Sequence, residues 1–154
     1  MRLLGAILSA LLLSVSLFAV HLAGPTPAHA ASEEAYGQAA QDATNAQRIK
    51  RNLAALKVNK CLRRHAERHA AAMAAEGDIW HQNLGRVLRS CDLVSVGENV
   101  AMGYASGRSV VNHGWMKSAG HRANILRRGY RLGVVSAVRG EDGMWYAAQL
   151  FGAR

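Results

Sequence analysis

The sequence has few acidic and aromatic residues and only two cysteines. Ten Asp and Glu residues stand against nineteen Lys and Arg residues, so the formal net charge is +9 at pH 7. The basic residues are scattered, without interleaved aromatic side chains or a known nucleic-acid-binding motif, so the charge does not predict nucleic-acid binding. Its simplest interpretation is a solvated basic surface, although it also favours encounter with acidic polymers and anionic lipid head groups.

The chain also lacks internal repeats, low-complexity tracts and linkers between folded segments. No sustained heptad pattern is present, so the sequence leaves the oligomeric state open. No independent nucleophile is evident, because Ser109 and Ser118 lack the strand-turn-helix context of a nucleophile elbow. These absences favour a binding protein over an enzyme.

The first thirty residues have the pattern of an export signal. A positive start at Met1-Arg2 precedes an almost wholly apolar run at 3–20, and Ala28-His29-Ala30 is a small-x-small cleavage motif. The alternative is an uncleaved membrane anchor, because the apolar run approaches the length that spans a bilayer. The helix-breaking Gly24-Pro25-Thr26-Pro27 favours cleavage after Ala30. We therefore expect an exported protein, periplasmic or extracellular, without a transmembrane segment after cleavage.

The remaining chain is long enough for one domain and too short for two. We expect an N-terminal segment at 31–44, mobile at 31–37, and a folded domain at 45–154. Helices are predicted over 39–52 and 59–75, the second capped by Asn59 and ended by Gly77. Four apolar residues at helical spacing mark the buried stripe of that second helix: Leu62, Ala66, Ala70 and Met73.

The C-terminal half changes from helix to strand. Residues 85–96 are predicted as loop with a short extended piece at 93–96. A third helix begins at Ser106 or Ser109 and is interrupted at Gly120. Apolar runs at 132–138 and 144–151 then predict a β-hairpin. Helices first and strands last, around a small sheet, indicate an α+β layered domain.

Cys61 and Cys91 are predicted to form one disulfide, because an exported chain enters an oxidising compartment. This bond would close a loop of about 30 residues and stabilise the fold by about 3–4 kcal/mol in the chain-entropy model. The alternative is a metal-binding or catalytic thiol. It has little support, because neither cysteine has a second cysteine or a histidine at ligand spacing.

Two histidines four residues apart, His65 and His69, project from one face of the second helix. With Glu67 they suggest a His-Glu-x-x-His zinc helix. In that motif the glutamate directly follows the first histidine, whereas Glu67 is turned about 200° from His65. We interpret the pair as structural, with His69 half-buried beside Met73 and His65 facing water among arginines.

Three further residues could carry chemistry. Glu98 lies in an otherwise apolar segment, and a buried carboxylate needs a partner, which could be backbone amides, an imidazolium or a metal. His81 lies in a loop after Trp80, a setting typical of surface or packing residues. His121 follows Gly120 at a predicted helix break, although it could also be a helix-ending histidine that interacts with the dipole. Spacing alone does not bring the three residues together.

A set of motifs gives the chain a family resemblance. In order they are Asn45-x-x-Arg48, Leu62-x-x-x-Ala66, Met73-Ala74, His81, Gly97-Glu98-Asn99, Trp115-Met116-x-Ser118-x-Gly120-His121-Arg122-x-Asn124-Ile125-Leu126, Leu132-Gly133-Val134 and Gln149-x-Phe151-Gly152. This order resembles the bacterial branch of the CAP superfamily, named for cysteine-rich secretory proteins, antigen 5 and pathogenesis-related 1 proteins. The resemblance runs from about Asn45 to Gly152. Its most specific part is the Gly-Glu-Asn block followed by Trp-Met-x-Ser-x-Gly-His-Arg.

The resemblance implies an α-β-α sandwich, with a small, mainly antiparallel sheet flanked by helices, and a cleft lined by two histidines and two acidic residues. By position the cleft residues are His81, Glu98 and His121, with Ser118 in place of the second acid. In some members the histidine pair binds zinc or another divalent cation, so His81 and His121 are the implied metal ligands. Without the fourth ligand, we expect modest metal affinity and no catalysis that needs paired carboxylates.

The resemblance implies a secreted binding module for a lipid, an envelope polymer or another small ligand. Some eukaryotic and yeast members hold sterols or fatty acids. The alternative is a metal-assisted hydrolase acting on peptide or cell-envelope substrates. In that case zinc on His81 and His121 would activate a carbonyl or water, with Glu98 as base. We prefer the binding module, because the sequence supplies no catalytic group that is independent of a metal.

Overall fold

The computed structural model describes residues 27–154, with side chains from residue 33 onward. The predicted export signal lies outside the described residues, except for the backbone of its last four, which begin the first helix. None of the described helices is long and apolar enough to cross a membrane.

A three-stranded antiparallel sheet forms the centre of the fold. Strand β1 (Ser95–Met102) and strand β2 (Leu132–Arg139) both pair with the central strand β3 (Trp145–Ala153), in the order β1-β3-β2. β3 is buried along nearly its whole length, whereas β1 and β2 are edge strands. The predicted hairpin is confirmed as the β2–β3 pair.

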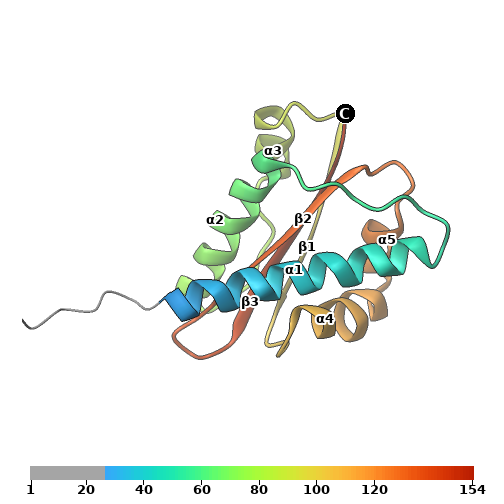
Figure 1. Ribbon diagram of the computed structural model, residues 1–154. Coiled ribbons are helices and arrows are strands. Elements are labelled where there is room, and N and C mark those ends of the chain that lie inside the picture. Colours follow the sequence, from blue (N-terminus) through green and yellow to red (C-terminus); the bar gives the residue numbers. More distant parts are fainter. Residues whose placement is uncertain (1–26) are drawn as a thin grey trace, which may run out of the picture.

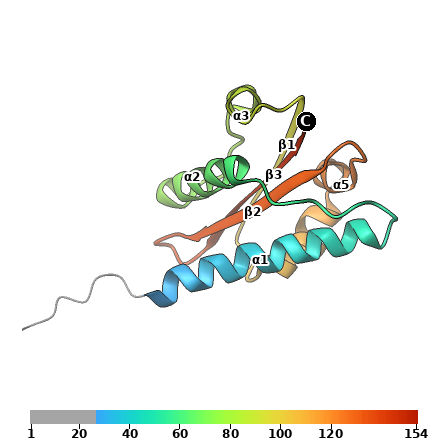
Figure 2. The same ribbon diagram turned by 45° about the horizontal axis from the view of Figure 1, so that its top comes forward.

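Helices cover both faces of this sheet (Figures 1 and 2). Helix α2 (Lys60–Glu76) and the short helix α3 (Leu84–Ser90) share one buried cluster with the sheet. The other cluster joins α1 (Pro27–Ile49) to the π-helical turn η1 (Val110–Gly114), the 3-10 turn η2 (Trp115–Lys117) and α5 (Ala119–Leu126). The short helix α4 (Gly107–Ser109) packs directly on α1. The implied α-β-α sandwich is confirmed.

Helix α2 follows its sequence signals closely. The Asn59 side chain accepts hydrogen bonds from the backbone N–H groups of Cys61 and Leu62, and Gly77 ends the helix with φ 68°, in the left-handed region. All four residues of the predicted stripe are fully buried. The disulfide is also confirmed, with Cys61 and Cys91 Sγ atoms 2.07 Å apart, and it ties the start of α2 to the end of α3.

The prediction of a mobile stretch at 31–37 is wrong, because α1 begins at Pro27 instead of residue 39. Tyr36 explains the order of this part of the helix. Its ring is 6% exposed and stacks on Trp145 with centroids 4.7 Å apart, and its hydroxyl donates to the Tyr104 carbonyl. These contacts are all with distant residues, so local composition does not reveal them. α1 continues without a break through residues 44 and 45.

Two further elements differ from the prediction. The stretch 85–96 contains α3, and β1 extends from Ser95 to Met102 where only a short piece at 93–96 was expected. The helix break lies at Gly114 to Ser118, whereas Gly120 is inside α5. β1 escaped prediction because polar Glu98 and Asn99 stand where a buried strand usually has apolar residues.

Candidate functional site

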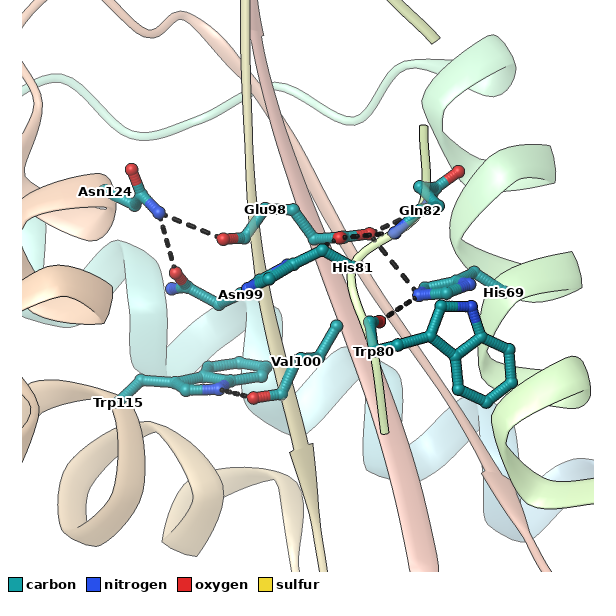
Figure 3. A network of polar contacts seen from close by, with 9 residues as sticks. All are labelled: His69, Trp80, His81, Gln82, Glu98, Asn99, Val100, Trp115 and Asn124. Atoms are coloured by element: carbon teal, nitrogen blue, oxygen red, sulfur yellow. Dashed lines mark hydrogen bonds and ion pairs between the residues drawn. The ribbon is translucent and has the colours of Figure 1, made fainter. Parts of the chain in front are cut away.

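Glu98, in the middle of β1, is the centre of a buried polar network (Figure 3). The residue is only 3% exposed. Its Oε2 accepts hydrogen bonds from His81 Nδ1 at 2.8 Å and from the backbone N–H of Gln82 at 3.1 Å, and its Oε1 accepts one from Gln82 Nε2 at 2.7 Å. The partners of the buried carboxylate are therefore an imidazole and amides.

His69 supports this network from α2. It is 6% exposed, which is more buried than predicted, and its Nε2 lies 2.7 Å from the Trp80 carbonyl and 3.9 Å from Glu98 Oε1. Its ring meets the Trp80 ring edge to face, with centroids 5.4 Å apart. His69 thus fixes the segment that carries His81. Helical spacing alone does not reveal this role, because Trp80 and Glu98 lie outside α2.

His81 presents one ring nitrogen outward. Its side chain is 57% exposed although its Nδ1 is held by Glu98. Nε2 has no partner among the side chains and backbone groups that the structure describes, so it remains available to a ligand. A carboxylate that holds one imidazole nitrogen is the usual means of orienting the other nitrogen toward a metal.

His121 lies in the first turn of α5, near His81. Burial lowers the pKa of His121, and the positive charge of His81 lowers this pKa further. Both effects favour the neutral imidazole, which is the form that binds metals. The His121 carbonyl accepts a hydrogen bond from Asn99 Nδ2 at 3.2 Å, which ties the residue to β1.

Buried amides connect β1 to three other elements. Asn99 donates to Gln149 Oε1 of β3 at 2.9 Å, and Gln149 donates to Thr44 Oγ1 of α1 at 2.8 Å. Asn124 of α5 donates to Asn99 Oδ1 and to the Glu98 carbonyl, both at 3.0 Å. Asn99, Gln149 and Thr44 are each 0% exposed, so these hydrogen bonds replace the bonds to water that the side chains lose on burial. The motif assigned no role to these amides, and Thr44 lies outside it.

Trp115 borders this network from the helical layer. The Trp115 indole donates to the Val100 carbonyl at 3.2 Å and is 1% exposed, so it anchors η2 against β1. Ser118 is partly exposed and precedes α5, where its side chain makes no capping hydrogen bond. A serine hydroxyl does not replace the charge of the missing carboxylate.

The metal-binding capacity of the site rests on two imidazoles. Within the described part of the chain, the only three His, Cys, Asp or Glu side chains whose ligand atoms lie within 4.8 Å of one another are Cys61, His65 and Cys91. Those two cysteines are joined in the disulfide. His65 does lie at ligand distance from both cysteines, so the prediction that neither cysteine has a histidine at ligand spacing is wrong. Because Glu98 is occupied by its partners, the implied ligands His81 and His121 are left with only their imidazole nitrogens to offer a cation.

A basic groove of about 730 Å³ adjoins the network, and we call it the arginine groove. Arg64 and Arg68 of α2 and Arg86 of α3 line it, together with His69, Trp80 and Gln82 of the network. His65 also lines it, and its Nε2 lies 2.8 Å from Ser90 Oγ. Burial lowers the pKa of His65, and the three arginines lower this pKa further. The groove therefore favours an anionic ligand.

The comparisons with known proteins agree with this architecture. The family described as "CAP: Cysteine-rich secretory protein family" matches residues 41–151. No curated protein matches the chain. Among solved structures, an SCP-domain extracellular protein from Bacillus anthracis is 26% identical with a TM-score of 0.70, over 86% of this chain and 45% of that protein.

Two other solved structures share the fold. A cysteine-rich secretory protein from Staphylococcus aureus is 19% identical with a TM-score of 0.66, over 84% of this chain and 41% of that one. An outer surface protein from Borrelia burgdorferi is 22% identical with a TM-score of 0.65, over 74% of this chain and 89% of that one. The chain thus spans less than half of the Bacillus and Staphylococcus proteins and most of the Borrelia protein.

Proposed function

The chain belongs to the cysteine-rich secretory protein (CAP) family, and from this premise we propose that it is an exported binding module with a ligand site at His81, Glu98 and His121. The observation that carries the proposal is the state of Glu98. Both of its oxygens are held by His81 and Gln82, so the carboxylate positions an imidazole for a ligand. Extracellular and outer-surface relatives, together with the disulfide, support export.

The same observation favours binding over the alternative, a metal-assisted hydrolase. A general base must reach a water molecule beside the substrate. Glu98 is 3% exposed and already accepts three hydrogen bonds, so this role would require it to release His81 or Gln82. Ser118 supplies no second carboxylate. The geometry therefore supports recognition of a ligand better than hydrolysis.

A divalent cation fits the site as an accessory group. His81 Nε2 and the neutral imidazole of His121 would hold it, and the Glu98 carboxylate would fix the His81 tautomer. When bound, zinc would offer open coordination positions to an oxygen of the ligand.

Among the candidate ligands, the arginine groove supports an anionic envelope polymer over a neutral lipid. Arg64, Arg68 and Arg86 line it, and the groove shares Gln82 with the Glu98 network. A phosphate-bearing polymer could therefore contact both surfaces. Guanidinium groups recognise phosphate through charge-assisted hydrogen bonds.

The test is calorimetric titration of the metal-stripped protein with zinc, followed by titration with poly(glycerol phosphate). We expect one zinc equivalent, lost in His81→Ala and in His121→Ala and weakened about 10- to 100-fold in Glu98→Gln, because Glu98 orients His81. Arg68→Glu should weaken binding of the polymer and leave zinc binding unchanged. The matched control is His113→Ala, since His113 is an exposed histidine of η1.

Equal zinc binding by His81→Ala and the native protein would contradict the cation site. Equal polymer binding by Arg68→Glu would contradict the proposed ligand class. The binding-module proposal itself fails if neither titrant binds, or if His113→Ala loses as much zinc affinity as His81→Ala.

A further inference from the structure

A second groove, of about 510 Å³, runs between α1 and α2 along β2, and we call it the β2-edge groove. It lies away from the network around Glu98, because β1 and β2 are opposite edges of the sheet. Its floor is formed by residues 134–138 of β2, with α1 and α2 as its walls. Figure 2 shows β2 passing between these two helices.

The outer edge of β2 is hydrogen-bonded at both ends, and two N–H groups between those ends lack a partner in the described residues. Near its start, the Gly133 N–H donates to the Lys57 carbonyl at 3.0 Å, and at its end the Arg139 N–H donates to Glu33 Oε1 at 3.2 Å. Because backbone direction alternates along a strand, the N–H groups of Val135 and Ala137 point the same way. Neither N–H has a partner within residues 33–154.

An edge of this kind accepts another strand. Lys57 already forms a parallel β-bridge with Leu132 of β2, just before the chain enters α2. Unpaired edge groups are the template for β-strand addition by an extended peptide. Helix α1 limits the space, because an added Cβ at Gly37 would lie 2.8 Å from the Val135 carbonyl. The α1 backbone therefore lies against the β2 edge at Gly37, and the groove of about 510 Å³ is the space that remains for a ligand.

Gln41 provides an independent sign of a missing partner. The residue lines the groove and is 5% exposed, yet neither its Oε1 nor its Nε2 has a hydrogen-bond partner in the described structure. Buried side-chain amides are nearly always satisfied. A peptide group offers one donor and one acceptor, which is the complement that the Gln41 amide needs.

The charges of the groove indicate the composition of the peptide. In a chain of net charge +9, three of the ten acidic residues line it, namely Glu33, Glu34 and Glu67. Glu34 and Glu67 are exposed and form no ion pair in the part of the chain that the structure describes. Arg63 is the one basic side chain of the lining. The rims therefore attract a cationic segment.

We infer that the β2-edge groove binds a short, extended, basic segment of a partner polypeptide. The segment adds a strand to β2 at Val135 and Ala137, hydrogen-bonds the Gln41 amide, and places basic side chains beside Glu34 and Glu67. This interaction is independent of the cation site at His81 and His121.

The test uses the end-blocked peptide Lys-Val-Lys-Val-Lys as the probe and amide NMR spectra of the full folded domain as the readout. We expect saturable shifts of the Val135 and Ala137 amides and of the Gln41 side-chain NH₂. Glu34→Lys and Glu67→Lys should each weaken binding about tenfold. Glu76→Lys, an exposed charge reversal on the same helix as Glu67 but outside the groove, should bind like the native protein, and so should His81→Ala.

A peptide that is N-methylated at alternate residues, which removes backbone donors and keeps the charge, should not bind. Equal binding of this peptide would overturn strand addition. Equal weakening by Glu76→Lys and Glu67→Lys would overturn the groove as the site. The proposal also fails if the probe does not bind at about 1 mM, or if the same amides shift with protein concentration alone, because a second copy would then occupy the groove.

Discussion

At the scale of single residues, the buried carboxylate of Glu98 is stable because three donors surround it. His81 and both N–H donors of Gln82 contact its oxygens at 2.7 to 3.1 Å. The arrangement leaves the charge solvated by protein groups and fixes one imidazole. Removal of any donor would leave part of a buried charge unpaired, which is costly.

His65 predicts how stability depends on pH. Burial and the neighbouring arginines lower its pKa below the ordinary 6.5. As pH falls through about 6.5, the unfolded chain takes up a proton that the folded chain does not, so stability falls with pH in this window. In His65→Gln, the melting temperature should therefore fall less between about pH 7.5 and about pH 5.5 than in the native protein.

The matched control for this pH series is His113→Gln, an exposed histidine of η1, which should keep the native slope. Added salt should also flatten the native slope, because it screens the arginine charges. If the melting temperature depends on pH equally in the native protein and in His65→Gln, the pKa of His65 is not lowered by folding.

Sequence patterns predicted single residues well where the cause was local. The capping role of Asn59 and the buried stripe of α2 depend on neighbours within one turn, and both are confirmed. The burial of Glu98 was predicted from its apolar neighbours, and its need for a partner is confirmed. Its actual partners are His81, 17 positions away, and Gln82, 16 positions away. The family resemblance grouped His81 with Glu98, whereas only the fold identifies Gln82.

At the scale of elements, the packing of α4 on α1 depends on a glycine. A Cβ at Gly107 would lie 2.1 Å from the Tyr36 carbonyl oxygen and 2.6 Å from the Ala40 backbone nitrogen. These neighbours are backbone atoms and cannot turn aside as side chains can. The two helices can approach this closely only because residue 107 has no side chain.

Gly107→Ala should therefore lower the free energy of unfolding by about 1–3 kcal/mol, since it overpacks this contact. The matched control is Gly120→Ala in α5, where no atom lies within 4 Å of the added Cβ. This control should raise stability by up to about 1 kcal/mol through helix propensity. Denaturant unfolding measures both, and equal stability of the two variants would contradict the contact.

Elements with a regular apolar pattern were predicted, and elements stabilised by distant contacts were not. α2, β2 and β3 lie close to their predicted ranges. The first turns of α1 were missed, because Tyr36 is ordered by Trp145 and Tyr104 from the far end of the chain. β1 was mostly missed because its buried polar residues interrupt the apolar pattern.

At the scale of the whole molecule, the sandwich exposes the two edges of its sheet to different surroundings. The edge formed by β1 carries Glu98, near His81 and the arginine groove. The edge formed by β2 carries the acidic β2-edge groove. The family resemblance predicted the sandwich and a cleft that contains Glu98, which lies on β1. The β2-edge groove was not predicted, because it depends on how α1 and α2 flank β2.

The central claim is that Glu98 holds His81 through Nδ1 and leaves Nε2 to the ligand. Long-range proton–nitrogen NMR spectra of ¹⁵N-labelled imidazoles, recorded above about pH 8 where histidine is ordinarily neutral, test it directly. The account predicts that His81 is the Nδ1–H tautomer and that zinc shifts the Nε2 signal of His81 and the ring signals of His121. An Nε2–H tautomer at His81, or zinc shifts confined to other histidines, would contradict it.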